Sequence, residues 1–257
     1  MSSFEFYADH FQHLRMERRD GILQVTLHSD GGTLRWGGGP HHELGAAFRH
    51  IAADRDTRVV ILTGCGDAFI ELVDEGNVGQ RLPATQMTPQ IWDRINWDAK
   101  QLLTNLLEID VPMIAAVNGP VTIHAELAVL CDIVLAADHA MFQDAPHFPN
   151  GLVPGDGVHV IWPLLLGINR GRYFLLTGQK LSARDALELG VVNEIMPAAD
   201  LLPRAWTLAE QLLRQPPLTL RYARLLLTQR LKQLMLENLG YGLALQGLAA
   251  NDYWPPA

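Results

Sequence analysis

The sequence predicts an α/β protein in which short buried strands alternate with amphipathic helices. Two patterns carry this prediction. Some segments alternate apolar with polar residues or are apolar throughout, and the segments between them repeat apolar residues at helical spacing. An alternation of the two patterns along one chain is typical of layered α/β folds. Since there is no linker and no low-complexity tract, we expect a single domain.

The predicted strands are short apolar segments. Residues 21–28 place Leu23, Val25 and Leu27 on one face and polar side chains on the other. Residues 59–64 are apolar up to a final glycine, which suits a strand buried on both faces. Further strands are expected at 113–120, 132–138, 140–144 and 191–196. Residues 1–20 are polar with scattered aromatics, and we expect a loosely held lead-in.

Helical spacing predicts the helices, and cap residues mark some of their ends. Thr88 is the expected N-cap of a long helix, with Pro89 in its first turn. Ser182 begins a shorter helix that ends at Gly190. The other helices are expected at 41–54, around 125–131, within 158–176 and from 198 onward. Loops are expected at 30–40, 76–89 and 146–157, the last being dense in proline and glycine.

Composition is that of an ordinary globular protein and excludes several classes. The 257 residues are 48% hydrophobic and 19% charged, and a chain of this length buries a core without disulfide or metal staples. The net charge of -8 argues against a nucleic-acid partner. Cys65 and Cys131 form no CxxC pair, which fits a reducing compartment. No apolar run reaches the about 18 residues of a spanning helix, and no signal peptide is visible. We therefore expect a cytoplasmic protein with no membrane partner.

Five segments in a fixed order resemble a known family. They are DTRVVILTGCGDAF (56–69), VPMIAAVNGP (111–120), CDIVLAADHAMF (131–142), GLVPGDG (151–157) and LLTGQKLSARDALELGVVNEIMP (175–197). Together they resemble the crotonase (enoyl-CoA hydratase/isomerase) superfamily over residues 14 to 230. The resemblance implies a single crotonase-fold chain over 1–257, with a spiral of ββα units over about 14–197. It also implies a C-terminal helical trimerisation region over about 198–257, in homotrimers or dimers of trimers.

The chain departs from this superfamily where a thioester oxygen is normally held. The run from Phe69 to Asp74 replaces a Gly-Ala-Asp, and residues 121–125 replace a glycine triplet. Because glycine lets backbone N–H groups approach a ligand closely, these losses argue against the usual oxyanion hole. The usual Pro-Glu catalytic acid is also missing. His147 stands at that position, and Asp156 fills the variable position of the following glycine-rich motif.

The altered set resembles a narrower group, the β-diketone hydrolases of the 6-oxocamphor hydrolase type. The likeness is carried by VNGPVTIHAEL, FQDAPHFPNGLVPGDGVHVIWP and NRGRYFLLTGQ. It implies retro-Claisen cleavage of a non-enolisable cyclic β-diketone to a keto acid, with no cofactor and no metal. The matching positions are His147 and Asp156 as a dyad that activates water. We expect one ring nitrogen of His147 to lie within hydrogen-bond reach of Asp156 and the other to face a pocket. His124 and Trp36 would bind the substrate oxygens. Gln246 replaces a glutamate that faces the site in that group, and it is expected to bind the substrate, with either a changed substrate or only a supporting role left open.

These residue types suit the reaction. Water needs a general base at neutral pH, and a histidine supported by a carboxylate supplies one. Histidine and indole N–H groups can donate to oxygens on which negative charge develops. Each residue also has a plainer interpretation: His147 as a surface histidine, Asp156 as a turn residue, His124 as a core histidine and Trp36 as a core aromatic.

Several alternatives stay open. Asp144 rivals Asp156 as the group that orients His147, and His41-His42 is expected to cap a helix or lie at the surface. Asp74 is expected to anchor its loop, and the 70–90 segment is longer than in the camphor-type group.

Two other functions stay open as alternatives to diketone hydrolysis. One is an acyl-CoA hydratase, isomerase or hydrolase, and the other is a non-catalytic crotonase-fold binding protein.

Overall fold

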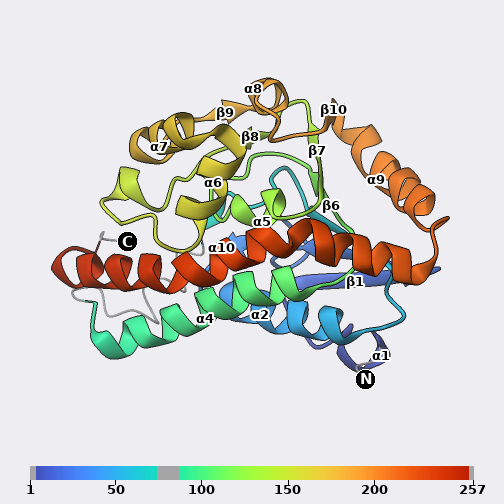
Figure 1. Cartoon of the computed structure of the whole chain (residues 1–257), viewed down its shortest axis with the longest axis horizontal. Helices are drawn as coiled ribbons and strands as arrows, with labels where there is room; N and C mark the ends of the chain where they lie inside the picture. Colours follow the sequence, from blue (N-terminus) through green and yellow to red (C-terminus); the bar gives the residue numbers. More distant parts are fainter. Residues whose placement is uncertain (1–3, 74–86, 255–257) are drawn as a thin grey trace.

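A six-stranded sheet forms the centre of the protein (Figure 1). The computed structural model describes residues 4–73 and 87–254. The strand order is β1-β2-β4-β6-β7-β10, in which β1 and β2 are antiparallel and all other neighbours are parallel. The strands are β1 (Leu14–Arg19), β2 (Ile22–Leu27), β4 (Val59–Gly64), β6 (Met113–Val117), β7 (Ile133–Ala137) and β10 (Glu194–Met196). The α/β class expected from the sequence is confirmed.

Helices cover both faces of this sheet. One core packs α2 (Gly38–Ala53) and α4 (Pro89–Glu108) against strand residues such as Val60. A second core packs α9 (Ala198–Leu212) against strand residues such as Ile61 on the opposite face. Because alternate side chains of β4 enter different cores, the segment has to be apolar along its whole length.

The same arrangement corrects the expectation that β2 has a polar outer face. Gln24 and Thr26 are buried, because α9 covers that side of the sheet. Trp206 of α9 donates its indole N–H to Oε1 of Gln24 at 2.8 Å, which satisfies the buried amide oxygen. The alternation in β2 therefore separates two buried faces.

Residues 4–19 are ordered, so the expectation of a loose lead-in is wrong for this part. β1 is the edge strand, and its inward side chains Leu14 and Met16 are buried. Tyr7 is fully buried and donates to Oδ2 of Asp54 at 2.8 Å, which also accepts from Arg18 at 2.9 Å. Charged residues between the apolar ones obscured this strand, although an edge strand commonly carries them on its exposed face.

The expected helix signals are present. The side chain of Thr88 accepts the N–H of Ile91, and Ser182 forms a reciprocal capping box with Asp185. The helical stretch within 158–176 is two helices, because Gly167 adopts a left-handed backbone (φ 80°) between them. The expected loop at 76–89, the role of Asp74 and the longer 70–90 segment fall wholly or mainly outside the described residues.

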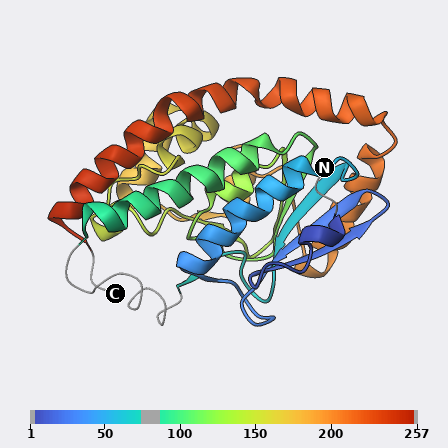
Figure 2. The same ribbon diagram turned by 90° about the horizontal axis from the view of Figure 1, so that it is seen from below.

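Smaller elements complete the chain, and α10 runs alongside α4 (Figure 2). The short strands pair as β3 with β5 and β8 with β9. The remaining elements are α1 (Phe4–Tyr7), β3 (Arg35–Trp36), β5 (Leu72–Val73), α5 (Glu126–Val129), β8 (Met141–Phe142), a 3₁₀ turn (Phe148–Asn150), α6 (Val158–Leu166), α7 (Ile168–Thr177), β9 (Leu181–Ser182), α8 (Ala183–Glu188) and α10 (Pro217–Asp252). Within the described ranges, no helix has the length and apolar character needed to span a bilayer.

Candidate active site

The candidate site lies where several segments leave the carboxyl ends of the parallel strands. Trp36 follows β2, His124 follows β6, and His147 and Asp156 lie beyond β7 and β8. In open α/β sheets, ligands bind at this edge because the connecting loops gather there. Side chains more than a hundred residues apart in the sequence are thereby brought to one place.

His147 lies between two carboxylates. Its Nδ1 is 2.6 Å from Oδ1 of Asp144, and its Nε2 is 3.1 Å from Oδ2 of Asp156. All three side chains are buried. Nδ1 is hydrogen-bonded to one carboxylate and Nε2 lies at ion-pair distance from a second, so the arrangement favours the imidazolium form of the ring.

The pKa shifts of His147 and Asp156 agree with the geometry of the three side chains Asp144, His147 and Asp156. Burial by itself lowers the pKa of His147, but Asp156 and Asp144 outweigh burial and hold the pKa well above its ordinary value. Burial by itself raises the pKa of Asp156, but His147 and His124 outweigh burial and hold that pKa below its usual range. The ion pair is therefore the stable form at neutral pH.

The structure brings His147 and Asp156 together as expected, but the expectation that the other ring nitrogen faces a pocket is wrong. Asp144 occupies that nitrogen. The sequence left open whether Asp144 or Asp156 orients His147. In the structure each contacts a different nitrogen of the same ring. Oδ2 of Asp144 and Oδ1 of Asp156 are buried and have no hydrogen-bond partner among the described residues, so each has an oxygen to offer to a water or a substrate.

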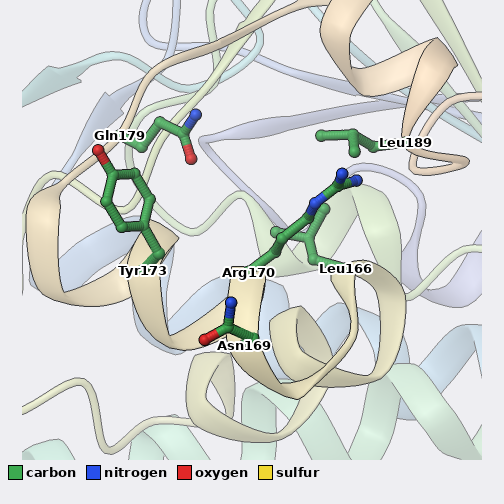
Figure 3. Close-up of a pocket in the computed structure, with 6 residues that line it drawn as sticks. All are labelled: Leu166, Asn169, Arg170, Tyr173, Gln179 and Leu189. Carbon is green, nitrogen blue, oxygen red and sulfur yellow. The ribbon is translucent and has the colours of Figure 1, made fainter.

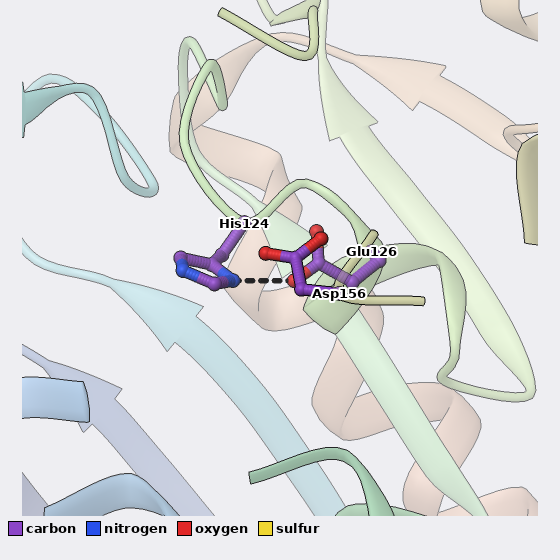
Figure 4. Close-up of side chains that lie close together, drawn as sticks. All are labelled: His124, Glu126 and Asp156. Carbon is purple, nitrogen blue, oxygen red and sulfur yellow. Dashed lines mark hydrogen bonds and ion pairs between the residues drawn. The ribbon is translucent and has the colours of Figure 1, made fainter. Parts of the chain in front are cut away.

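His124 has its own carboxylate, which the sequence analysis missed. Its Nδ1 is 2.5 Å from Oε1 of Glu126, a side chain that is only 1% exposed at the start of α5 (Figure 4). The carboxylate of Asp156 lies beside this pair. The signal was present in the sequence as a histidine and a glutamate two residues apart within HAEL, but that spacing alone does not show that both point inward.

Aromatic rings pack around His124. The ring centroid of Trp36 is 4.1 Å from that of His124, and the ring of His41 is 5.5 Å from Trp36 and 5.4 Å from His124. His41 was expected to cap a helix or lie at the surface, and the structure corrects this. Its Nε2 is buried, and burial lowers its pKa to about 3, so it is neutral. His42 matches the surface expectation, being exposed and paired with Asp98.

Gln246 lies on α10 against the loop that carries Asp156. A Cβ added to Gly155 would lie 2.9 Å from Cβ of Gln246 and 2.2 Å from the carbonyl oxygen of Gly242, so loop and helix backbones touch. Oε1 of Gln246 is buried and has no hydrogen-bond partner among the described residues. The position therefore supports the loop that carries Asp156 and offers one acceptor oxygen.

Two backbone N–H groups of the turn before His124 are engaged within the protein. Thr122 and Ile123 both donate to the carbonyl oxygen of Ile70, at 2.9 and 3.3 Å. The missing glycines had predicted that this turn does not serve as a thioester oxyanion hole. These two hydrogen bonds leave neither of the two N–H groups free to donate to a ligand.

Three side chains of the site could also hold a metal ion. Ligand atoms of His124, Glu126 and Asp156 lie within 4.8 Å of one another. Two of these side chains, His124 and Glu126, already share a hydrogen bond, and Asp156 is paired with His147. A cation would have to displace protons from these bonds, so the donor set fits proton chemistry at least as well as metal binding.

A surface pocket lies apart from these residues. It is formed by α6, α7 and the segments around β9 and α8, and its lining contains none of the histidines or carboxylates described above (Figure 3). The lining residues are Leu166, Asn169, Arg170, Tyr173, Gln179 and Leu189. This pocket is therefore separate from the candidate site.

Comparisons with known proteins agree on the family and differ on the activity. The profile of the enoyl-CoA hydratase/isomerase family matches residues 17–242. The carnitinyl-CoA dehydratase of Escherichia coli (strain K12) is 30% identical over 208 residues, covering 80% of this chain and 77% of that protein. A solved β-diketone hydrolase from the cyanobacterium Anabaena sp. PCC 7120, bound to (S)-3-oxocyclohexyl acetic acid, is 48% identical with a TM-score of 0.91, covering 96% and 97% of the two chains. An enoyl-CoA hydratase/isomerase from Mycobacterium paratuberculosis is 26% identical with a TM-score of 0.84, covering 93% of each chain.

Proposed function

Because the chain belongs to the enoyl-CoA hydratase/isomerase family, whose crotonase fold it shares, we propose that it acts within that family as a β-diketone hydrolase. The observation that carries the proposal is the buried chain Asp144–His147–Asp156, set beside His124 and Trp36. It provides a general base and N–H donors but no carboxylic acid at the family's usual place. The likeness to the Anabaena hydrolase supports the same activity.

The substrate class follows from the chemistry of a keto acid such as the one bound to the Anabaena hydrolase. This keto acid has two ring carbons beside its ketone. Joining the carboxyl carbon to the one that is farther from the acetic acid arm gives a bridged bicyclic 1,3-diketone. The carbon between the two carbonyls is then a bridgehead and cannot enolise. We propose small diketones of this kind, or monocyclic ones with two substituents on the central carbon, as substrates.

Water activation is assigned to His147. The ring must first lose its Nε2 proton, while Asp144 keeps the proton on Nδ1 and so fixes the tautomer. Nε2 then takes a proton from a water held near the free oxygen of Asp156. The hydroxide oxygen bonds to one carbonyl carbon, whose oxygen becomes negatively charged.

Bond cleavage needs donors at the second carbonyl. When the tetrahedral adduct collapses, the carbon–carbon bond breaks and its electron pair forms an enolate on the other carbonyl. His124 and Trp36 are the proposed N–H donors to these oxygens, where they would stabilise the developing charge. The imidazolium of His147 returns its proton to the enolate carbon, which yields the keto acid and restores the base.

The deciding experiment is an assay for ring opening. The purified protein should convert the bicyclic diketone that corresponds to 3-oxocyclohexyl acetic acid, and 6-oxocamphor, into keto acids followed by mass spectrometry. The His147→Ala variant is the inactive control. Absence of product with all diketones would overturn the proposal.

The second candidate is an acyl-CoA hydratase or dehydratase, which the likeness to carnitinyl-CoA dehydratase favours. It requires two free backbone donors for the thioester oxygen, and Thr122 and Ile123 already donate to Ile70. Hydration of crotonyl-CoA without diketone cleavage would select this candidate. Activity on neither substrate would select a binding role.

We also propose a homotrimer or a dimer of trimers. Large apolar side chains are exposed on α7 and α10, and such a surface marks an interaction site when it is extensive. The most exposed of them are Ile168, Tyr173, Tyr222, Leu226, Leu227, Leu236, Tyr241 and Leu248. α9 by contrast packs on its own sheet, so the trimerisation role falls on α10. Light scattering after gel filtration tests the assembly.

A further inference from the structure

We infer that Glu126 is a positioning residue that holds His124 as an imidazolium, with its remaining N–H directed at the substrate. This inference rests on the proposed function, which assigns His124 to a substrate oxygen but gives no task to Glu126. A buried carboxylate in a catalytic centre requires a partner, because an isolated buried charge is costly. Glu126 is 1% exposed and its partner is His124.

The geometry fixes which nitrogen is free. Oε1 of Glu126 lies 2.5 Å from Nδ1 of His124, so Nδ1–H donates to the carboxylate and Nε2 remains for a ligand. His124 also has a left-handed backbone (φ 49°), which residues with a Cβ rarely adopt. Strained conformations of this kind persist where surrounding contacts hold them, and they concentrate at functional sites.

The charges around His124 decide its protonation state. Burial by itself would remove its proton, and the buried cation of His147 acts in the same direction. Glu126 and Asp156 oppose both, and the pKa of His124 is raised above its ordinary value. His41 on α2 is neutral and adds no charge.

Two further observations favour the cation. The Trp36 ring centroid is 4.1 Å from that of His124, within the range at which an aromatic ring stabilises a positive charge. Burial and Asp156 raise the pKa of Glu126, while His124 lowers it, so each member of the pair depends on the other for its charge. An imidazolium N–H is a stronger donor to an enolate oxygen than a neutral one, and this is the task that the structure assigns to Glu126.

The test is Glu126→Gln, which keeps the size and an acceptor oxygen but removes the charge. The limb of the kcat/KM profile that is set by His124 should move to lower pH, because the active form needs His124 protonated and His147 neutral. The limb set by His147 should move less, because Asp156 and Asp144 are the carboxylates that hold its pKa above the ordinary value. kcat should fall about 10- to 100-fold with KM nearly unchanged, since the donor weakens but is not lost.

Two variants serve as controls. Glu126→Asp retains the charge and should restore the limb set by His124 at least in part. Glu194→Gln removes a glutamate from an ion pair with Arg204, away from the site, and should leave both limbs in place. An unchanged profile in Glu126→Gln would overturn the inference, as would an equal shift in Glu194→Gln.

A second readout does not depend on turnover. In protein labelled with ¹⁵N at histidine, both ring nitrogens of His124 should be protonated at neutral pH, and Glu126→Gln should lower this titration. An unchanged titration overturns the pairing even in an active enzyme. Failure of the proposed function gives a different result, in which no diketone is cleaved by the wild type although the titration still shifts.

Discussion

Asp144 and Asp156 hold opposite nitrogens of the same imidazole, at 2.6 Å from Nδ1 and 3.1 Å from Nε2 of His147. The two contacts are unequal, and the longer one is on the nitrogen that is assigned to water. A base cannot accept a proton while it donates one, so the Nε2 contact has to be broken before each turnover. This relationship determines how the enzyme should respond to pH.

The first prediction concerns the pH profile. Asp156 and Asp144 raise the pKa of His147 well above its ordinary value, despite burial. The neutral ring is the active form, so activity is present above this raised pKa and is lost as the pH falls through it. kcat/KM of the wild type should therefore rise on an acid limb that lies above pH 6.5, the ordinary value for histidine. A pH-independent plateau that extends below this value would contradict the assignment of His147 as the base.

The second prediction separates the two aspartates. Asp144→Asn removes one of the charges that raise the pKa of His147, so the acid limb should move to lower pH. The plateau rate should also fall, by up to about 10⁴-fold, because an amide N–H can select the wrong tautomer. Steady-state kinetics over the full pH range measures both effects. A near-wild-type rate in Asp144→Asn would show that Asp144 does not orient the ring.

The third prediction concerns the N–H donors. Trp36→Phe keeps an aromatic ring and removes the indole N–H, and His124→Ala removes the second donor. Each should lower kcat by about 10²–10³-fold while KM changes little, since the hydrogen bonds strengthen as enolate charge develops. Changes in KM alone would mean that both residues only shape the pocket. Circular dichroism should show that both variants remain folded.

The sequence predicted the fold well because burial patterns are local. The strand at 59–64 and the capped helices starting after Thr88 and Ser182 need only neighbouring residues to be recognised. The edge strand over 14–19 was missed, since its exposed charges resemble a loop when its partner strand is unknown.

The site was only partly predictable. His147, Asp156, His124 and Trp36 were proposed from a resemblance, and the structure gathers them. The placement of His41 was wrong, and Glu126 was not considered at all. Both depend on which face of a helix or turn points inward, and this is set by packing between elements distant in the sequence.

The fourth prediction concerns metal removal. His124 and Glu126 already share a hydrogen bond, and Asp156 is paired with His147, so a cation at these three residues would have to compete with both contacts. Diketone cleavage should therefore survive dialysis against a strong chelator, followed by assay in metal-free buffer. Loss of activity that a divalent ion restores would contradict this and would identify those three residues as the ligands to test.

The last prediction uses two glycines of the same helix. A Cβ at Gly242 would lie 2.3 Å from the carbonyl oxygen of Gly155, the residue before Asp156, whereas nothing lies within 4 Å of a Cβ at Gly240. Gly242→Ala should push the catalytic loop away from α10, destabilise the protein by about 1–3 kcal/mol and reduce kcat. Gly240→Ala should leave kcat unchanged and stabilise the exposed helix by up to about 1 kcal/mol. Urea unfolding and steady-state kinetics measure both variants. Equal effects at the two positions would show that contact between helix and loop does not place Asp156, and the loop would then be held by its other neighbours.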